Sequence, residues 1–162
     1  MTSTLQGKFL AIFLVLLSAS LAACSPLAPE SASGPAHTPT PAVCQPSPIQ
    51  KSKNEFPQIQ ATMHTEGEAW ALLFFDQAQA GQELKIVWRI TGEGDQMTAQ
   101  ARLMDGTVIS PVWGPDYHGG STWQRPGREW GTGFNFPKPG CWILTVTRGA
   151  TSAEIRLSVL AP

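Results

Sequence analysis

The sequence predicts an all-β domain, a single antiparallel β-sandwich of about seven to eight short strands. Charged residues make up only 14 % of the chain while Gly, Pro and Trp are plentiful, and this composition favours short strands joined by turns. Beyond residue 25, no run of apolar residues keeps helical spacing for longer than two turns. Between residues 56 and 162, apolar and polar residues alternate in one short run after another. Because each such strand buries only one face, two sheets are needed to cover each other.

The clearest predicted element is a β-hairpin within residues 134–159. Two runs of alternating apolar residues flank a polar, glycine-containing turn at residues 148–151. Side chains point to alternate faces of a strand, so each run has one buried face and one wetter face. A Pro-Lys-Pro-Gly corner at residues 137–140 precedes the first run, because proline is not tolerated inside a central strand. The residues expected to face the core are Trp142, Leu144, Val146, Ala153, Ile155, Leu157 and Val159.

The remaining strands are predicted from the same alternation. In residues 84–90 the apolar side chains occupy every second position, with Lys85 and Arg89 on the opposite face. Asp105 and Gly106 are expected to form a two-residue turn, because Asp-Gly favours the positive φ angles that a tight hairpin needs. The strands expected before the C-terminal hairpin are residues 58–65, 68–75, 84–90, 97–104, 107–113 and 129–136, with a long loop at residues 114–128.

The N-terminus has the features of an export signal over residues 1–23. Lys8 and the free amine supply positive charge, an uninterrupted apolar run covers residues 9–17, and small residues follow. That run is shorter than the ~20 apolar residues that a membrane-spanning helix needs. Residues 21–24, Leu-Ala-Ala-Cys, resemble the lipobox of bacterial lipoproteins. The resemblance implies cleavage before Cys24, acylation of Cys24 with fatty acids such as palmitate, and anchoring on the extracytoplasmic face of a bacterial cell membrane. The alternative is an ordinary cleaved signal with an incidental cysteine.

Residues 24–55 are expected to form a flexible tether. They contain half of the prolines of the chain, with Ser, Thr, Ala and Gln between them and few large apolar groups. Such a segment buries too little surface to offset the entropy lost on ordering it. Proline-rich chain extends by about 3.1 Å per residue, so the stretch from Cys24 to Cys44 reaches about 60 Å. The β-sandwich domain is therefore predicted to span residues 56–162.

With Cys24 acylated, Cys44 and Cys141 remain, and we expect them to form a disulfide. Exported proteins fold in compartments where disulfides persist, and the bond would join the start of the domain to the C-terminal hairpin. A cross-link closing a loop of nearly a hundred residues contributes about 4–5 kcal/mol in the chain-entropy model. The alternative is two free thiols.

Residues around Cys141 also suggest a family. Phe136, Pro137, Gly140, Cys141 and Trp142 form a Phe-Pro-x-x-Gly-Cys-Trp motif near the end of an exported β-domain. This motif resembles that of a group of uncharacterised bacterial lipoproteins. The resemblance implies an immunoglobulin-like β-sandwich and no known catalytic activity.

The loop and strand at residues 114–133 form the segment most typical of a binding site. Aromatic and charged side chains alternate here, on the kind of loop where binding residues concentrate in β-sandwiches. Sugars stack on flat aromatic faces, and Trp beside Arg is common at protein interfaces. A wall glycan or another protein is therefore the expected partner. The competing interpretation is structural, with Trp130 in the core, Trp123 covering a sheet edge, and Arg128 and Glu129 paired in solvent. The candidate ligand contacts are Asp116, Tyr117, His118, Trp123, Arg125 and Arg128.

Other classes of function receive less support from the sequence. Met63 and His64, with Asp116 and His118, raise the alternative of copper binding, but their spacing is not that of a compact ligand set, and no metal or cofactor is expected. The chain lacks the Gly-x-Ser-x-Gly, His-Glu-x-x-His and phosphate-binding glycine motifs, so we expect no catalysis. A formal net charge of −1 gives no general attraction to nucleic acid. The sequence thus predicts a membrane-anchored envelope lipoprotein with a non-catalytic binding or structural module.

Overall fold

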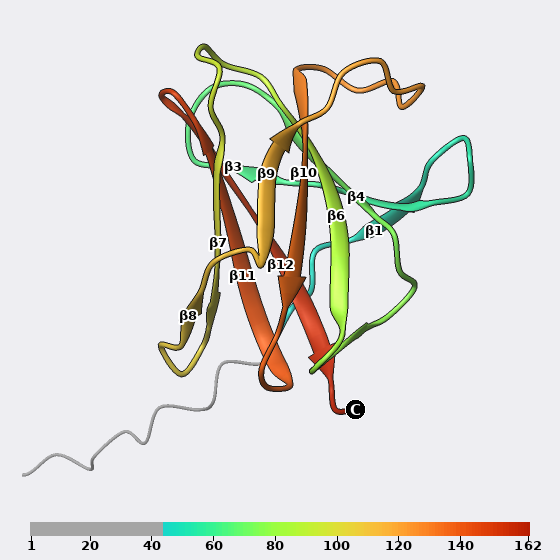
Figure 1. Cartoon of the computed structure of the whole chain (residues 1–162), viewed down its shortest axis with the longest axis vertical. Coiled ribbons are helices and arrows are strands. Elements are labelled where there is room, and N and C mark those ends of the chain that lie inside the picture. The colour runs from blue at the N-terminus through green and yellow to red at the C-terminus, as the bar shows by residue number, and fades with distance from the viewer. Residues whose placement is uncertain (1–43) are drawn as a thin grey trace, which may run out of the picture. The chain divides into compact units, whose positions relative to one another are not determined.

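The computed structural model describes residues 44–162, and these residues form two β-sheets packed face to face (Figure 1). Each sheet contains six strands, and the all-β sandwich predicted from the sequence is confirmed. The predicted export signal, the lipidation site Cys24 and tether residues 24–43 lie outside the described residues. Within residues 44–162, no helix is long and apolar enough to cross a membrane.

The first sheet carries the candidate site. Its strands, in spatial order, are β1 (Ile49–Lys51), β2 (Pro57–Gln60), β4 (Ala69–Leu73), β6 (Glu83–Ile90), β10 (Arg128–Asn135) and β9 (Trp113–Tyr117). The central pair, β6 and β10, is antiparallel along its whole length, from Ile90 opposite Arg128 to Glu83 opposite Asn135. This long pairing fixes which side chains of the two strands lie together on the outer face.

The second sheet is built around the predicted hairpin. Its strands, in spatial order, are β3 (Thr62–Met63), β12 (Thr151–Leu160), β11 (Gly140–Arg148), β7 (Thr98–Leu103) and β8 (Val108–Ile109). A two-residue strand, β5 (Ala78–Gln79), runs parallel to the end of β12, and the other pairings of this sheet are antiparallel.

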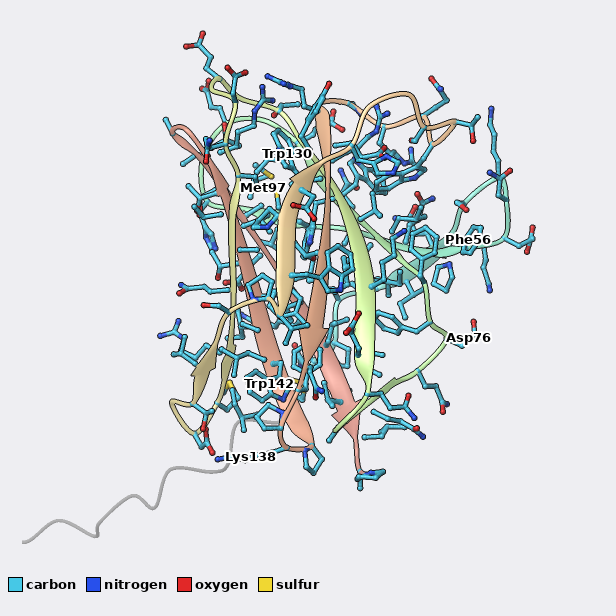
Figure 2. The ribbon with its side chains drawn as sticks, in the orientation of Figure 1. Phe56, Asp76, Met97, Trp130, Lys138 and Trp142 are labelled. Atoms are coloured by element: carbon cyan, nitrogen blue, oxygen red, sulfur yellow. A yellow bond between two sulfur atoms is a disulfide. The ribbon has the colours of Figure 1, made fainter. Side chains whose placement is uncertain are left out.

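Large apolar side chains fill the space between the sheets. Figure 2 shows Trp130 and Trp142 between the layers, towards opposite ends of the domain. The Trp88 indole donates a 2.9 Å hydrogen bond to the Thr132 hydroxyl, which donates to the Ile86 carbonyl at 3.2 Å, so the polar groups of this region are paired. The largest fully buried apolar side chains are Trp88, Trp130, Trp142, Phe134, Phe136, Ile59, Leu73, Ile86, Ile90, Leu144 and Ile155.

A buried arginine closes one end of the core. Arg148 is only 6 % exposed, and its guanidinium lies 5.1 Å from the centre of the Trp130 ring. It donates hydrogen bonds of 3.0 Å to the backbone carbonyls of Ile90 and Gly94. The cation is therefore satisfied by carbonyl oxygens and an aromatic face rather than by a carboxylate.

The predicted hairpin and the predicted inward faces are confirmed. β11 and β12 pair from Gly140 opposite Val159 to Arg148 opposite Thr151, with Gly149 in the turn at a φ of 55°. Every residue that the alternation assigned to the core side of this hairpin is buried. The same holds for the inward residues predicted in residues 84–90. In the predicted strand at residues 129–136, the alternate residues Trp130, Thr132, Phe134 and Phe136 are also buried.

The predicted count of seven to eight strands is wrong, since the described residues form twelve. The chain changes sheets at two places where one continuous strand was expected. The predicted strand at 58–65 divides at Ala61 into β2 of the first sheet and β3 of the second. The predicted strand at 107–113 ends at Ile109, shortly before Pro111, which has no N–H to donate to a ladder. The chain then enters the first sheet as β9, which occupies the start of the segment expected to be a loop.

The predicted disulfide between Cys44 and Cys141 is present, and it closes a loop with a sequence separation of 97. Regular structure begins earlier than the predicted domain start at residue 56, because β1 lies within the segment assigned to the tether. Ser47 is also fixed, since its backbone N–H donates to the Arg156 carbonyl and its hydroxyl accepts from the Arg156 N–H, both at 2.9 Å. The residues after Cys44 are therefore held by both sheets.

An exposed ion pair lies at the base of the domain, where Figure 2 labels Lys138. Lys138 Nζ donates to Asp105 at 2.8 Å and to the Thr107 hydroxyl at 3.0 Å. The hydrogen bond from Lys138, followed by that from the Thr107 backbone, lowers the pKa of Asp105 from 3.8 to about 2. The pair links the turn before β8 to the corner before β11.

Candidate functional site

The loop between β9 and β10, residues 118–127, folds back over the outer face of the first sheet. Trp123 in this loop is 8 % exposed and packs with Trp70, Leu72 and Val87, which point outwards from β4 and β6. The cluster is a second apolar core on the face of the sheet that is turned away from the sandwich. It explains why Val87, on the predicted wetter face of its strand, is 4 % exposed.

Gln58 of β2 holds the second half of the loop, at Trp123 and Arg125. Its side chain is 2 % exposed, and its Oε1 accepts hydrogen bonds from Trp123 Nε1 at 3.1 Å and from Arg125 Nε at 3.2 Å. Its Nε2 donates to the Lys51 carbonyl at 3.2 Å. The Arg125 guanidinium lies 3.8 Å from the centre of the Trp70 ring, so the same arginine also covers the edge of the apolar cluster.

Glu129 of β10 holds the first half of the loop, at His118 and Ser121. This carboxylate is 3 % exposed and accepts from Arg89 Nε at 2.8 Å and from the Ser121 hydroxyl at 2.6 Å. Its other oxygen lies 3.1 Å from His118 Nδ1. Arg89 also donates to the Arg125 carbonyl at 2.7 Å, which ties the sheet to the loop a second time. A buried carboxylate is costly unless it is paired and hydrogen-bonded, and here both conditions are met.

The arrangement around Glu129 does not assemble a nucleophile with its base. Ser121 and His118 each contact Glu129, and among the described residues no hydrogen bond joins one to the other. The carboxylate is already paired with Arg89 and accepts the Ser121 hydroxyl on the same oxygen. These three side chains therefore position the loop.

A groove lies between this loop and the loop joining β1 to β2, residues 52–56. Figure 1 shows the two loops, orange and blue-green, projecting on the same side of the domain. The groove has a volume of about 180 Å³. Enclosed small-molecule pockets usually begin at about 300 Å³, so this hollow accommodates one ring or side chain of a larger ligand. The groove is lined by Ser52, Lys53, Asn54, Phe56, Gln58, Leu72, Thr122, Trp123, Gln124 and Arg125.

Two exposed phenylalanines extend the groove along the sheet. Phe56 and Phe74 are 41 % and 42 % exposed, and their ring centres lie 5.0 Å apart. Lys85 Nζ lies 4.5 Å from the centre of the Phe74 ring. Figure 2 shows Phe56 at the outer margin of the domain, on the side where the two loops project. Large exposed aromatic side chains beside a concave surface are typical of binding sites.

The structure divides the predicted contact residues into two groups. Trp123 and Arg125 form one wall of the groove, with the Trp123 ring mostly covered. Asp116, Tyr117 and Arg128 lie around the paired strands β9 and β10 and do not line the groove. His118 lines an adjoining hollow of about 170 Å³ and contacts Glu129.

Tyr117 and Arg128 form a separate exposed pair. Tyr117 is 59 % exposed, its ring packs edge-on against Trp130, and the Arg128 guanidinium lies 4.5 Å above it. Arg128 also bonds Asp95, and that hydrogen bond raises the pKa of Arg128 above its ordinary value. The structural interpretation that pairs Arg128 with Glu129 is therefore wrong, since each has a different partner. Its placement of Trp130 in the core is confirmed.

The histidines proposed for copper binding belong to different sheets. His64 follows β3 of the second sheet and lies 3.2 Å from Glu154, whereas His118 follows β9 of the first. Within residues 44–162, no group of three or more His, Cys, Asp or Glu side chains is placed to hold a metal ion.

Four residues that build this site carried no sequence signal that singled them out. Gln58 and Arg89 occupy the expected polar face of their strands, and nothing local showed that a distant loop covers that face. Lys53 and Phe56 lie in the segment read as the end of the tether and the start of the domain. Phe56 beside Pro57, a large aromatic residue at a domain boundary, was the one available hint.

Comparison of the chain with protein-family models, with curated proteins and with solved structures gave no match in any of the three. The lipoprotein resemblance drawn from residues 136–142 therefore stays a prediction.

The covered position of Trp123 predicts that replacing it weakens the fold. Trp123→Ala should lower the free energy of unfolding by about 3 kcal/mol, because it exposes the outer apolar cluster and leaves Gln58 without its indole donor. Urea unfolding followed by circular dichroism measures this change. Gln124→Ala, at the exposed neighbouring position, should change the unfolding free energy by less than about 0.5 kcal/mol. Equal stability of the Trp123→Ala variant and the parent would contradict the docked loop.

Proposed function

We propose that this chain is a bacterial cell-envelope lipoprotein. In this proposal Cys24 carries the lipid anchor, residues 25–43 tether the domain to the extracytoplasmic membrane face, and the sandwich is a non-catalytic binding module. The module is of the immunoglobulin-like class, a view supported by antiparallel sheets between which the chain passes back and forth. The disulfide between Cys44 and Cys141 is also consistent with an exported protein.

The groove between the 52–56 and 118–127 loops is the observation that carries the binding function. It combines exposed aromatic side chains with hydrogen-bonding groups, and its loop wall is held by Gln58 and Glu129. Binding to such a surface costs little ordering entropy, because the residues are already in place. A partner protein or a wall glycan is the ligand, and the wall glycan is favoured by the small volume of the groove and by the exposed ring of Phe56 at its margin.

The lipid anchor predicts incorporation of a fatty acid at one cysteine. Cells fed a clickable palmitate analogue should label the wild-type protein, and the Cys24→Ser variant should remain unlabelled and leave the membrane fraction. In-gel fluorescence of the immunoprecipitated protein measures the label. Labelling of the Cys24→Ser variant at the wild-type level would contradict the anchor.

The binding function predicts that envelope material is captured through the groove. Beads carrying the protein should retain wall material from the producing bacterium, and Phe56→Ala with Phe74→Ala should reduce retention at least about tenfold. These side chains are exposed, so the unfolding midpoint should stay near that of the parent.

A matched control is available on the second sheet. Met104 and Val108 are 54 % and 55 % exposed and do not line the groove. Their double replacement by Ala removes exposed apolar side chains, as the double phenylalanine variant does, but at a site outside the groove. This variant should retain envelope material as the parent does. Equal losses in the two double variants would show that capture is non-specific.

A further inference from the structure

We infer that the ligand of the groove is an acidic saccharide, a glycan chain bearing carboxylate or phosphate groups. This inference rests on the proposed function and names the chemical class of its ligand. It follows from the charge of the groove lining, from the polar side chains at its rim, and from its aromatic margin.

The groove is lined by two cations and by no carboxylate. Lys53 belongs to one loop and Arg125, whose guanidinium packs on Trp70, to the other, so each wall of the hollow contributes one cationic side chain. Among the described residues, neither of these side chains forms an ion pair. Arg125 uses its Nε for Gln58, and among the described residues its guanidinium pairs with no carboxylate. An anionic group between the two walls would therefore find two cations that are not already neutralised.

The acidic side chains around the groove are not paired with these two cations. Glu68 accepts from Nε1 of Trp70, the ring on which Arg125 packs, and among the described residues it forms no ion pair with Arg125. Glu129 lines only the adjoining hollow and is paired with Arg89. Glu55 and Asp76 line another hollow, which shares Asn54 and Phe56 with the groove. Phe56 thus lies between the groove, which is lined by Lys53 and Arg125, and the hollow that is lined by Glu55 and Asp76. The 118–127 loop bounds the groove and not the acidic hollow.

The neutral lining suits hydroxyl groups. Asn54, Thr122 and Gln124 are short or flexible polar side chains at the rim, able to donate and accept. Ser52 Oγ is buried and has no hydrogen-bond partner among the described residues. Since this oxygen is buried, it does not face a ligand in the groove, and the hydroxyl-binding groups are the three rim side chains.

The size and the margin of the groove favour a saccharide over an acidic peptide. A hollow of about 180 Å³ accepts one sugar ring, and the exposed face of Phe56 offers it a stacking surface. Acidic peptide motifs are typically bound by clusters of Arg side chains, whereas one Arg and one Lys line this groove beside the aromatic rings of Phe56 and Trp123. A shallow groove open to solvent also lets a longer glycan chain continue along Phe74 and Lys85.

The test uses the mature full-length protein in detergent micelles, titrated in a calorimeter with three defined probes. These are a galacturonic acid tetrasaccharide, its carboxyl-reduced neutral form, and a glutamate tetrapeptide of equal charge. We expect the acidic tetrasaccharide to bind at least about tenfold more tightly than either of the other probes. Equal affinity for the neutral form, tighter binding of the peptide, or no binding of the acidic tetrasaccharide would each overturn the inference.

Two lysines of the same loop region provide a matched pair of variants. Lys53→Gln removes a charge that lines the groove, and Lys51→Gln removes the same charge from β1, outside the groove. Lys53→Gln should weaken binding of the acidic tetrasaccharide about five- to tenfold and leave the weak binding of the neutral form unchanged. Lys51→Gln should leave both affinities within about twofold of the parent. Equal effects of the two variants would show general electrostatic attraction and overturn the inference.

The failure of this inference is distinguishable from the failure of the proposed function. If envelope capture depends on Phe56 and Phe74 while the acidic tetrasaccharide does not bind, the groove is a binding site for a different ligand class. If capture is independent of these residues, the binding function itself is contradicted.

Discussion

The candidate site depends on two polar side chains, Gln58 and Glu129, that are buried under the 118–127 loop. Each would be costly to bury alone, and the loop that covers them supplies hydrogen bonds to both, beside those that Gln58 makes with Lys51 and Glu129 with Arg89. Trp123 adds the apolar part of the same contact by covering Trp70, Leu72 and Val87. Polar pairing and apolar packing favour the same position of the loop, so the loop is held against the sheet and the groove beside it needs no ligand to form.

The rest of the domain supplies a rigid platform for this loop. β6 and β10 pair over eight positions and carry Arg89 and Glu129 opposite each other, so the ion pair is set by strand register. The other wall of the groove, the 52–56 loop, follows β1, and the chain just before it is held by the Cys44–Cys141 disulfide and by Ser47 against β12. Both walls are therefore fixed to the sandwich, which is the condition for recognition at low entropic cost.

Periodicity in the sequence was sufficient for the core and insufficient for the site. The inward residues of β6, β10, β11 and β12 could be assigned because a two-residue period is a local property of the chain. The cysteine pairing followed from the count of cysteines and the export signal. The sheet changes at Ala61 and Pro111 were missed, because alternation continues across them while the hydrogen-bonding partner changes. The groove was missed because it joins residues about 70 positions apart, such as Lys53 and Arg125, whose meeting depends on the whole fold.

The docked loop is tested most directly by the exchange rate of the Trp123 indole N–H. This proton is donated to Gln58 Oε1, and the Trp123 side chain that carries it is 8 % exposed. In nuclear magnetic resonance spectra recorded after transfer to heavy water, we expect the signal of this proton to persist far longer than that of a free indole. Gln58→Ala should abolish the protection of the Trp123 indole and leave the Trp88 indole protected. Exchange of the Trp123 indole as fast as free indole in the parent protein would contradict the account.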